Sequence, residues 1–398
     1  MKPLIPDLPV QMRGWRHAMH QRPEIGFDVY ETADKVAANL RNFGLEVHTG
    51  IGRSGVVGVL RKGNSDQAIG LRADMDALLI QEENTFAHRS INDGCMHACG
   101  HDGHSAMLLG AAKQLAEEGI FDGTVFFIFQ PAEESGLGAQ AMIDDGLFER
   151  FPMSAVYGMH NMPGKKLGTI STRPGPFMAS EDTFAIEVQG KGGHASQPHQ
   201  GIDSMLVATF IVQSIQAIVS RNIDPMETAT VSVTQIAGDG LSNVIPNRVT
   251  IKGDCRCFSH EVRDLIERRL EEISAGICSA HGAVFSFQYN RSCPATINTS
   301  IETAAAVTAA ETILNECDVD GNAKAETISE DFACMLQAKP GCYVLIGNGA
   351  DSVGGCKLHT PDYDFNDELL SIGAAYWSTL VEQQLPTNGT CQQERTTK

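Results

Sequence analysis

Residues 124–129, with the sequence TVFFIF, form an apolar run of strand length without a charged residue. A strand buried on both faces has such a continuous apolar run, whereas a strand with one solvated face alternates apolar and polar residues. We therefore predict a central strand in a sheet that is covered on both sides. Open parallel sheets bind ligands just beyond the carboxyl ends of their strands. We therefore expect a ligand site in the residues that follow Phe129.

Strands and helices alternate on either side of that run, which predicts an α/β fold with a mostly parallel sheet flanked by helices. Apolar β-branched runs predict the strands, and the helical spacing of apolar residues predicts the helices. The predicted strands are 54–60, 68–73, 155–159 and 342–346, and the predicted helices are 12–19, 32–43, 103–118, 137–145, 301–315 and 367–383.

From about residue 181 the pattern changes to strand, helix, two strands, helix and strand, the order of a ferredoxin-like α+β sandwich. These segments are 183–188, 204–220, 229–236, 248–255, 260–280 and 284–289. A chain of 398 residues is long enough for two domains. We predict one discontinuous catalytic domain, 1–181 and 295–398, interrupted by an inserted domain, 182–294. The polar tail after Pro386 is expected to be disordered.

The formal net charge of −19 argues against nucleic acid or an anionic membrane as a partner, because both select basic surfaces. No apolar run approaches the roughly 20 residues that span a bilayer. The first ten residues lack a basic region followed by an apolar stretch, so we expect no signal peptide and a cytoplasmic protein. Most of the eleven cysteines then read as small buried apolar residues.

Cys99 is the one cysteine whose neighbours suggest chemistry, in the segment MHACGHDGH at 96–104. Thiolate and imidazole are good ligands for Zn²⁺ and related divalent ions. Gly100 lets the backbone turn so that Cys99 and His101 can converge on one point. The plain alternative is a buried thiol beside a capping histidine.

Glu133 and Glu134 end the segment QPAEE, 130–134, which comes directly after the strand that ends at Phe129. Two adjacent carboxylates repel each other unless one binds a metal ion while the other carries a proton. The plain alternative is a solvated helix start, where glutamate suits the helix dipole. His160 follows the next buried strand, and His359 lies between a strand and the last helix; each alone could be an ordinary histidine. Four ligand-type groups at loop positions after strands are jointly a stronger signal.

These motifs resemble the aminoacylase–carboxypeptidase superfamily of metallohydrolases, in the branch of hippurate hydrolase, N-acyl-amino-acid deacylases and plant auxin-conjugate hydrolases. The resemblance runs nearly end to end. The matching segments are 16–24, 71–78, 96–104, 130–134, 158–161, 190–196, 242–247, 329–332 and 359–361.

The resemblance implies two divalent metal ions, Mn²⁺ or Zn²⁺, with Co²⁺ or Ni²⁺ as alternatives. Cys99 would bridge them; His101 and His160 would complete one site, and Glu134 and His359 the other. Glu133 would be the general base.

Outside that ligand set, the resemblance implies that Asp76 and Asp102 orient ligand imidazoles. Glu330 and Asp331 could either orient a ligand in the same way or have a structural role.

In the inserted domain, the resemblance implies that His194 stabilises an oxyanion and that Arg256, assisted by Asn243, binds the substrate's carboxylate. Relatives dimerise through this domain, so a homodimer or a dimer-based oligomer is expected, with the inserted domain as lid and dimerisation domain. Read without the resemblance, His194 could be a turn residue and Arg256 an ordinary strand residue. One departure is the segment 253–257, GDCRC, where relatives commonly carry a hydroxyl residue beside the arginine.

The activity that follows is metal-dependent hydrolysis of the amide bond of N-acyl amino acids, with Glu133 taking the proton of the attacking water. A metallo-dipeptidase or carboxypeptidase would use the same residues and is the alternative. A catalytically inactive binding protein is disfavoured because Glu133 and all five proposed ligands are present.

Overall fold

The computed structural model describes residues 3–351 and 354–387, and the chain forms two compact units. Unit 1 comprises Met1–Gly175, Ile297–Lys324 and Asp331–Lys398, and unit 2 comprises Pro176–Thr296 and Ala325–Glu330. The boundaries predicted from sequence fall a few residues away, at 181–182 and 294–295. The segment 325–330 was assigned to the catalytic domain, but the amide of Ala179 donates to the carbonyl oxygens of Glu326 and Ile328, which ties it to unit 2. The tail expected to be disordered lies outside the described residues from 388 onward.

Unit 1 is built on an eight-stranded sheet with the order β1-β2-β4-β3-β5-β16-β6-β15. Its strands are β1 (Glu46–Ile51), β2 (Gly55–Lys62), β3 (Ala68–Asp74), β4 (Gly123–Gln130), β5 (Ala155–Pro163), β6 (Ile170–Ser171), β15 (Val319–Asp320) and β16 (Gly341–Gly349). The four strands β4, β3, β5 and β16 are parallel neighbours, whereas β1 and β2 add antiparallel at one edge. The run TVFFIF lies in β4, and every residue of that strand is buried, as predicted.

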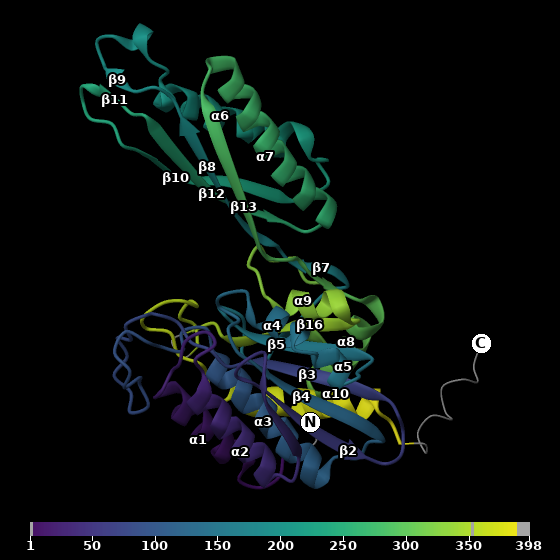
Figure 1. The fold of residues 1–398 in the computed structure, drawn as a ribbon. Helices are drawn as coiled ribbons and strands as arrows, with labels where there is room; N and C mark the ends of the chain where they lie inside the picture. Colours follow the sequence, from purple (N-terminus) through teal and green to yellow (C-terminus); the bar gives the residue numbers. More distant parts are fainter. Residues whose placement is uncertain (1–2, 352–353, 388–398) are drawn as a thin grey trace, which may run out of the picture. The chain divides into compact units, whose positions relative to one another are not determined.

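Helices cover both faces of this sheet (Figure 1). On one face, α1, α2, α3, α8 and α10 supply side chains to one large apolar core, and α3 packs on β3, β4 and β5. On the other, α4 packs on β4 and α9 on β5. The helices are α1 (Leu8–His20), α2 (Tyr30–Asn42), α3 (His101–Glu118), α4 (Gly138–Asp144), α5 (Leu147–Arg150), α8 (Ser300–Ile313), α9 (Phe332–Ala338) and α10 (Leu369–Gln384). Sequence reading missed β1, a largely exposed edge strand with few apolar residues, and the short α9.

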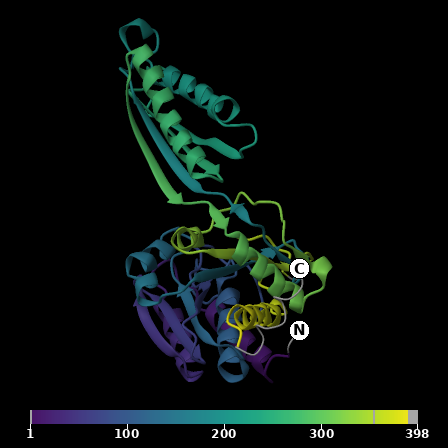
Figure 2. The same ribbon diagram turned by 90° about the vertical axis from the view of Figure 1, so that its right-hand side faces the viewer.

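Unit 2 contains the expected ferredoxin-like arrangement, with four antiparallel strands in the order β10-β12-β8-β13. Helices α6 and α7 lie side by side on one face of that sheet (Figure 2). The elements are β8 (Glu181–Gln189), α6 (Ser204–Ala217), β10 (Ala229–Gly238), β12 (Arg248–Cys257), α7 (His260–His281) and β13 (Val284–Cys293). A two-stranded ribbon, β9 (Gly193–His194) with β11 (Val244–Ile245), extends one end of the unit. The remaining short strands are β7 (Gly175–Met178) and β14 (Thr296–Asn298).

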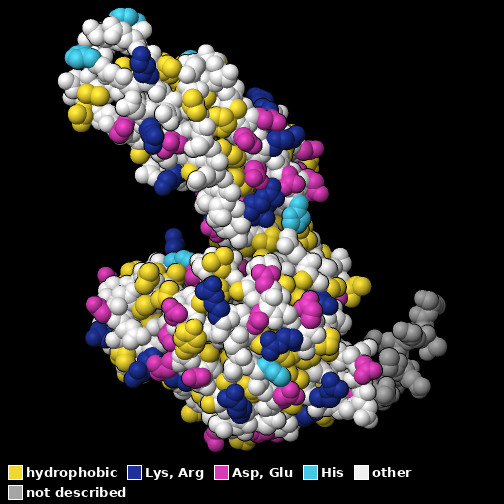
Figure 3. All heavy atoms as spheres, viewed as in Figure 1, with side chains coloured by type: hydrophobic (Ala, Val, Ile, Leu, Met, Phe, Trp, Pro, Cys, Tyr) yellow, Lys and Arg dark blue, Asp and Glu magenta, His cyan; other side chains and the backbone are white. Residues whose placement is uncertain are grey.

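Helix α6 and the π-helical turn that follows it, Ser204–Asn222, are long and apolar enough to cross a membrane by length and composition alone. The sequence reading had found no run of that kind. One side of this helix, including Val207, Ile211 and Ile215, packs into the core of unit 2. Such packing is the ordinary reason for an apolar helix in a folded domain. Basic and acidic side chains are interspersed on the face of each unit seen in Figure 3.

Candidate metal centre and catalytic residues

The candidate centre lies where neighbouring parallel strands end. Glu133 follows β4, Asp76 follows β3, and His160 stands near the end of β5. Cys99 comes just before α3, the helix that packs beneath these strands. Because parallel neighbours end at the same edge of a sheet, side chains that are far apart in sequence meet there.

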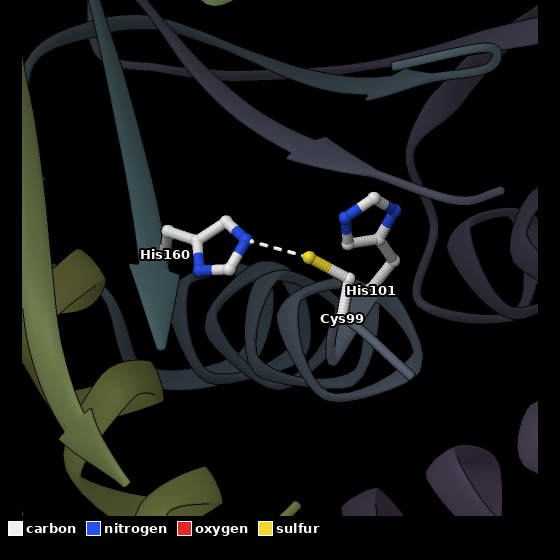
Figure 4. Close-up of side chains that lie close together, drawn as sticks. All are labelled: Cys99, His101 and His160. Atoms are coloured by element: carbon white, nitrogen blue, oxygen red, sulfur yellow. Dashed lines mark hydrogen bonds between the residues drawn. The ribbon is translucent and has the colours of Figure 1, made fainter. Parts of the chain in front are cut away.

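Cys99, His101 and His160 form the first group of potential ligands. Their ligand atoms all lie within 4.8 Å of one another, and all three side chains are buried. Figure 4 shows the Cys99 sulfur facing the His160 ring, with His101 beside it, and 3.2 Å separates Sγ from His160 Nε2. Thiolate and imidazole together suit zinc-like divalent ions.

Cys99, Glu134 and His359 form a second group that meets the same distance criterion. His359 Nε2 lies 3.5 Å from Glu134 Oε2. Cys99 is common to both groups, which is the arrangement that a bridging ligand requires. His101 Nε2 and Glu134 Oε1 are buried without a hydrogen-bond partner among the described residues. Orphaned buried polar atoms need an explanation, and a bound cation supplies one. The donor set therefore fits a pair of divalent ions.

The hydrogen bonds of His160 favour a neutral ring whose Nε2 can bind a metal ion. Its Nδ1 donates to the carbonyl oxygen of Asn161 at 2.6 Å, so the lone pair of the neutral ring is on Nε2, the atom that faces Cys99. Burial holds the pKa of His160 well below its usual range, which keeps the ring neutral. A metal ligand must be neutral imidazole, so both effects favour ligation.

Cys99 needs a cation to ionise. Burial raises the pKa of its thiol well above the usual value, and the neighbouring carboxylates of Glu134 and Glu133 raise it further. Only the thiolate binds metal. A divalent ion in contact with the sulfur would reverse this effect, because a coordinating thiol is deprotonated outright.

Asp76 organises the glutamate pair and His101 together. Its two oxygens accept the backbone N–H groups of Glu133, at 3.0 Å, and Glu134, at 3.2 Å. Oδ1 also lies 3.4 Å from His101 Nδ1, so Asp76 lies beside an expected ligand imidazole. Ala132 adopts φ 54°, a left-handed conformation uncommon for a residue with a side chain. Strain of this kind persists where surrounding contacts enforce it, and Asp76 supplies two of them.

Negative charge accumulates around His101. Burial lowers the pKa of this imidazole, but the carboxylates of Asp74, Asp76 and Glu134 outweigh burial and raise the pKa to about 10. Burial also raises the pKa of Asp76. The same surplus of carboxylate charge would stabilise divalent cations in this centre.

A buried hydrogen-bond network next to the centre was not predicted from the sequence. His104 Nδ1 lies 2.6 Å from Asp74 Oδ1, its Nε2 lies 2.7 Å from Asn161 Oδ1, and the Asn161 amide donates to the Tyr363 hydroxyl. Gly100 has φ 94°, and a Cβ there would stand 2.4 Å from Asn161 Oδ1. Glycine is thus required both by the left-handed backbone and by close packing. His104, the third histidine of MHACGHDGH, was the sequence feature that could have indicated this network.

Asp331 has a structural position in unit 1. It is buried and accepts from Arg72 Nη2 at 3.1 Å, from Gln130 Nε2 at 2.7 Å and from the amide of Ala139 at 2.9 Å. These contacts join β3, β4 and α4. Of the two roles open for Asp331, they favour the structural one.

Asp102 differs from its predicted role. Its Oδ2 lies 2.9 Å from His20 Nδ1 and 3.4 Å from Arg16 Nη1, and neither is an expected ligand. Asp102 follows His101 in α3, and adjacent helical residues face different directions. The prediction that Asp102 orients a ligand imidazole is therefore corrected: it anchors α3 to α1.

In unit 2, His194 and Asn243 lie on the same ribbon, where the amide of Ala195 donates to the Asn243 carbonyl oxygen. His194 is exposed, and its Nδ1 accepts from the Ser196 amide at 3.1 Å and lies 2.8 Å from the Ser196 hydroxyl. A neutral ring with Nδ1 as acceptor has its proton on Nε2. With Nδ1 accepting from the Ser196 amide, Nε2 is the ring nitrogen left to donate a hydrogen bond, as an oxyanion requires.

Arg256 lies away from Asn243. Asn243 precedes the start of β12 at Arg248, and Arg256 stands next to its other end. A strand that rises about 3.3 Å per residue separates Arg248 from Arg256 by roughly 26 Å. The expectation that Asn243 assists Arg256 at one carboxylate thus fails within a single chain.

The fold and the donor set define the class, a metal-dependent hydrolase. Residues 70–383 match the sequence profile described as "Peptidase family M20/M25/M40". The chain is 41% identical to hippurate hydrolase of Campylobacter jejuni subsp. jejuni, over 96% of this chain and 99% of that protein. It is 34% identical to N-acetylcysteine deacetylase of Bacillus subtilis, over 94% and 96% of the two chains. A solved Bacillus subtilis structure, described as a dinuclear metal binding peptidase from the M20 family, matches with a TM-score of 0.83 and 31% identity over 95% and 98% of the chains.

The chain belongs to peptidase family M20/M25/M40. Within that family it is an amidohydrolase.

Proposed function

We propose that this amidohydrolase cleaves the amide bond of N-acyl amino acids, such as N-acetyl or N-benzoyl derivatives, into a carboxylic acid and a free amino acid. Two divalent ions, Mn²⁺ or Zn²⁺, would be held by the two ligand groups that share Cys99. The observation that carries the proposal is this shared cysteine together with Glu133, whose Oε2 lies 3.8 Å from His101 Nε2.

Ions held there would polarise the amide carbonyl and lower the pKa of water. Glu133 is positioned by the Asp76 contact to its backbone, and it receives a proton during attack on the carbonyl carbon. It then passes that proton to the nitrogen of the leaving amino acid. Glu133→Gln should lower kcat by about 10²–10⁴ while the metal content stays unchanged. A variant with wild-type kcat would exclude Glu133 as the base.

The choice of N-acyl amino acids over peptides rests on the relatives. Hippurate hydrolase and N-acetylcysteine deacetylase are named for N-acyl amino acid substrates. The family as a whole is named for peptidases, so a metallo-dipeptidase or carboxypeptidase is the second candidate. A substrate panel separates them: cleavage of N-acetyl and N-benzoyl amino acids supports the proposal, and cleavage of dipeptides alone supports the alternative.

We also propose that the protein acts as a homodimer in which His194 and Asn243 serve the partner's metal centre. The α6 face that is not packed on the sheet exposes apolar side chains, and β10 is an edge strand. Exposed apolar patches and unpaired strand edges are common at interfaces. The apolar side chains are Met205, Leu206 and Phe210 on α6, and Val219 on the π-helical turn that follows it.

Mixing two inactive variants tests this directly. If His194 acts on the partner's centre, a dimer of one Glu133→Gln chain and one His194→Ala chain contains one complete site. Random reassortment then restores about a quarter of the wild-type sites. If His194 acts within its own chain, no mixed dimer is active. Ultracentrifugation of the mixture verifies that dimers form.

We propose the cytoplasm as the compartment. The ten cysteines in the described part of the chain are all free thiols, and a reducing compartment keeps such thiols unpaired. Fractionation of cells with an antibody to the chain tests this proposal.

A further inference from the structure

The strand β12 presents alternate residues to the two faces of the unit 2 sheet. Val249, Ile251 and Cys255 pack into the core under α6 and α7. Asp254 and Arg256 therefore share the opposite face, because side chains alternate along a strand. Both are only partly buried. Arg256 is thus an accessible cation on the helix-free face of the sheet.

Two carboxylates already contact this guanidinium. Its Nε lies 3.0 and 3.2 Å from the two oxygens of Asp254. Its Nη1 lies 3.3 Å from Glu181 Oε2 and 3.2 Å from the Ser329 hydroxyl, which itself donates to Glu181. Nη2 has no hydrogen-bond partner among the described residues.

Asp254 and Glu181 occupy different nitrogens of the Arg256 guanidinium. Asp254 takes the Nε edge and leaves the Nη1 and Nη2 edge for a second, two-point carboxylate contact. Glu181 takes Nη1, which is one of the two nitrogens that such a contact needs. Glu181 is about a third exposed and therefore able to turn away into solvent.

Resting on the proposed function, and on the expectation that Arg256 binds the carboxylate of the N-acyl amino acid, we infer that Glu181 is a built-in competitor for that carboxylate. Glu181 must leave Nη1 when the substrate's carboxylate binds there. The competition weakens binding of every substrate with a free carboxylate and leaves neutral analogues unaffected. Glu181 thereby sets how strongly the enzyme prefers acids over their amides.

The test compares N-benzoylglycine with N-benzoylglycinamide, which differ only in the carboxylate. Glu181→Gln should lower KM for the acid about two- to fivefold, the range for a solvent-accessible ion pair, with kcat unchanged and no shift for the amide. The matched control is Glu187→Gln, which removes the same charge from β8 at a contact of 3.9 Å with Arg248. Equal shifts for acid and amide, or the same shift in the control, would overturn the inference.

Calorimetry on the chelated full-length chain separates this inference from the proposed function. N-benzoylglycine should bind the wild type, bind Glu181→Gln more tightly and bind Arg256→Met weakly or not at all. If wild type and Glu181→Gln bind N-benzoylglycine equally and Arg256→Met does not bind it, then Arg256 binds the carboxylate and Glu181 does not compete for it. If the metal-loaded wild type neither binds nor cleaves N-benzoylglycine or the N-acetyl amino acids of the panel, the proposed function falls and the competitor falls with it.

Discussion

Asp76 Oδ1 accepts the backbone N–H of Glu133 at 3.0 Å, so a carboxylate at the end of one strand fixes the proposed general base after the next. The other oxygen of Asp76 holds the amide of Glu134, a proposed metal ligand. Base and ligand therefore share one anchor, although their side chains have different tasks.

Asp76→Asn should lower metal affinity or kcat by about 10- to 100-fold, as is typical when a group behind metal ligands is changed. The amide retains one acceptor oxygen but loses the charge beside His101. Metal titration and steady-state kinetics measure the two effects. Asp145→Asn is a suitable control, because Asp145 also accepts a backbone N–H, that of Gly52, at a partly exposed position. Wild-type behaviour of Asp76→Asn would show that the anchor is dispensable.

Cys99→Ala should reduce the bound metal from two ions per chain to at most one, because Cys99 belongs to both ligand groups. Chelation of the wild type should abolish activity, and Mn²⁺, Zn²⁺ or Co²⁺ should restore it. Elemental mass spectrometry of dialysed protein gives the stoichiometry. Cys342→Ala removes another buried thiol, in β16, and should keep both ions. Two tightly bound ions in Cys99→Ala would contradict a bridging role.

Arg16→Met should destabilise the folded chain by about 3 kcal/mol or more, because it removes a buried cation from a cluster of three carboxylates. The Arg16 side chain is 1% exposed and contacts Asp102, Asp364 and Asp367. Arg13→Met also removes a contact with Asp367, but Arg13 is 56% exposed, so its effect should stay below about 1 kcal/mol. Urea unfolding of both variants measures the difference, and equal losses would contradict this assignment.

Stability should fall as pH rises from about 6.5 to about 9. Burial lowers the pKa of His20, but Asp102 and Glu82 outweigh it and raise the pKa to about 9. A group with a raised folded-state pKa stabilises fully below its unfolded pKa, and that stabilisation is lost as pH passes its folded pKa. His20→Gln should flatten this part of the profile of unfolding free energy against pH. An unchanged slope in the variant would assign the effect to other groups.

The sequence by itself determined the main architecture and the donor set. The uncharged run in β4 required burial on both faces, and the change of pattern near residue 181 marked a second kind of fold. Cys99, Glu134, His160 and His359 could be chosen because each has ligand chemistry beside a predicted strand end or in a loop. These inferences work because hydrophobic periodicity and donor chemistry are local properties of the chain.

The tertiary structure decided which residues share a neighbour. Asp76 and Asp102 looked alike in sequence, yet the first holds Glu133 and the second holds His20. Asn243 and Arg256 were paired in the prediction, but β12 keeps them apart. The physical reason is that direction and distance depend on strand order and helix rotation, which are set by packing between segments far apart in the chain. No local sequence pattern encodes these directions and distances.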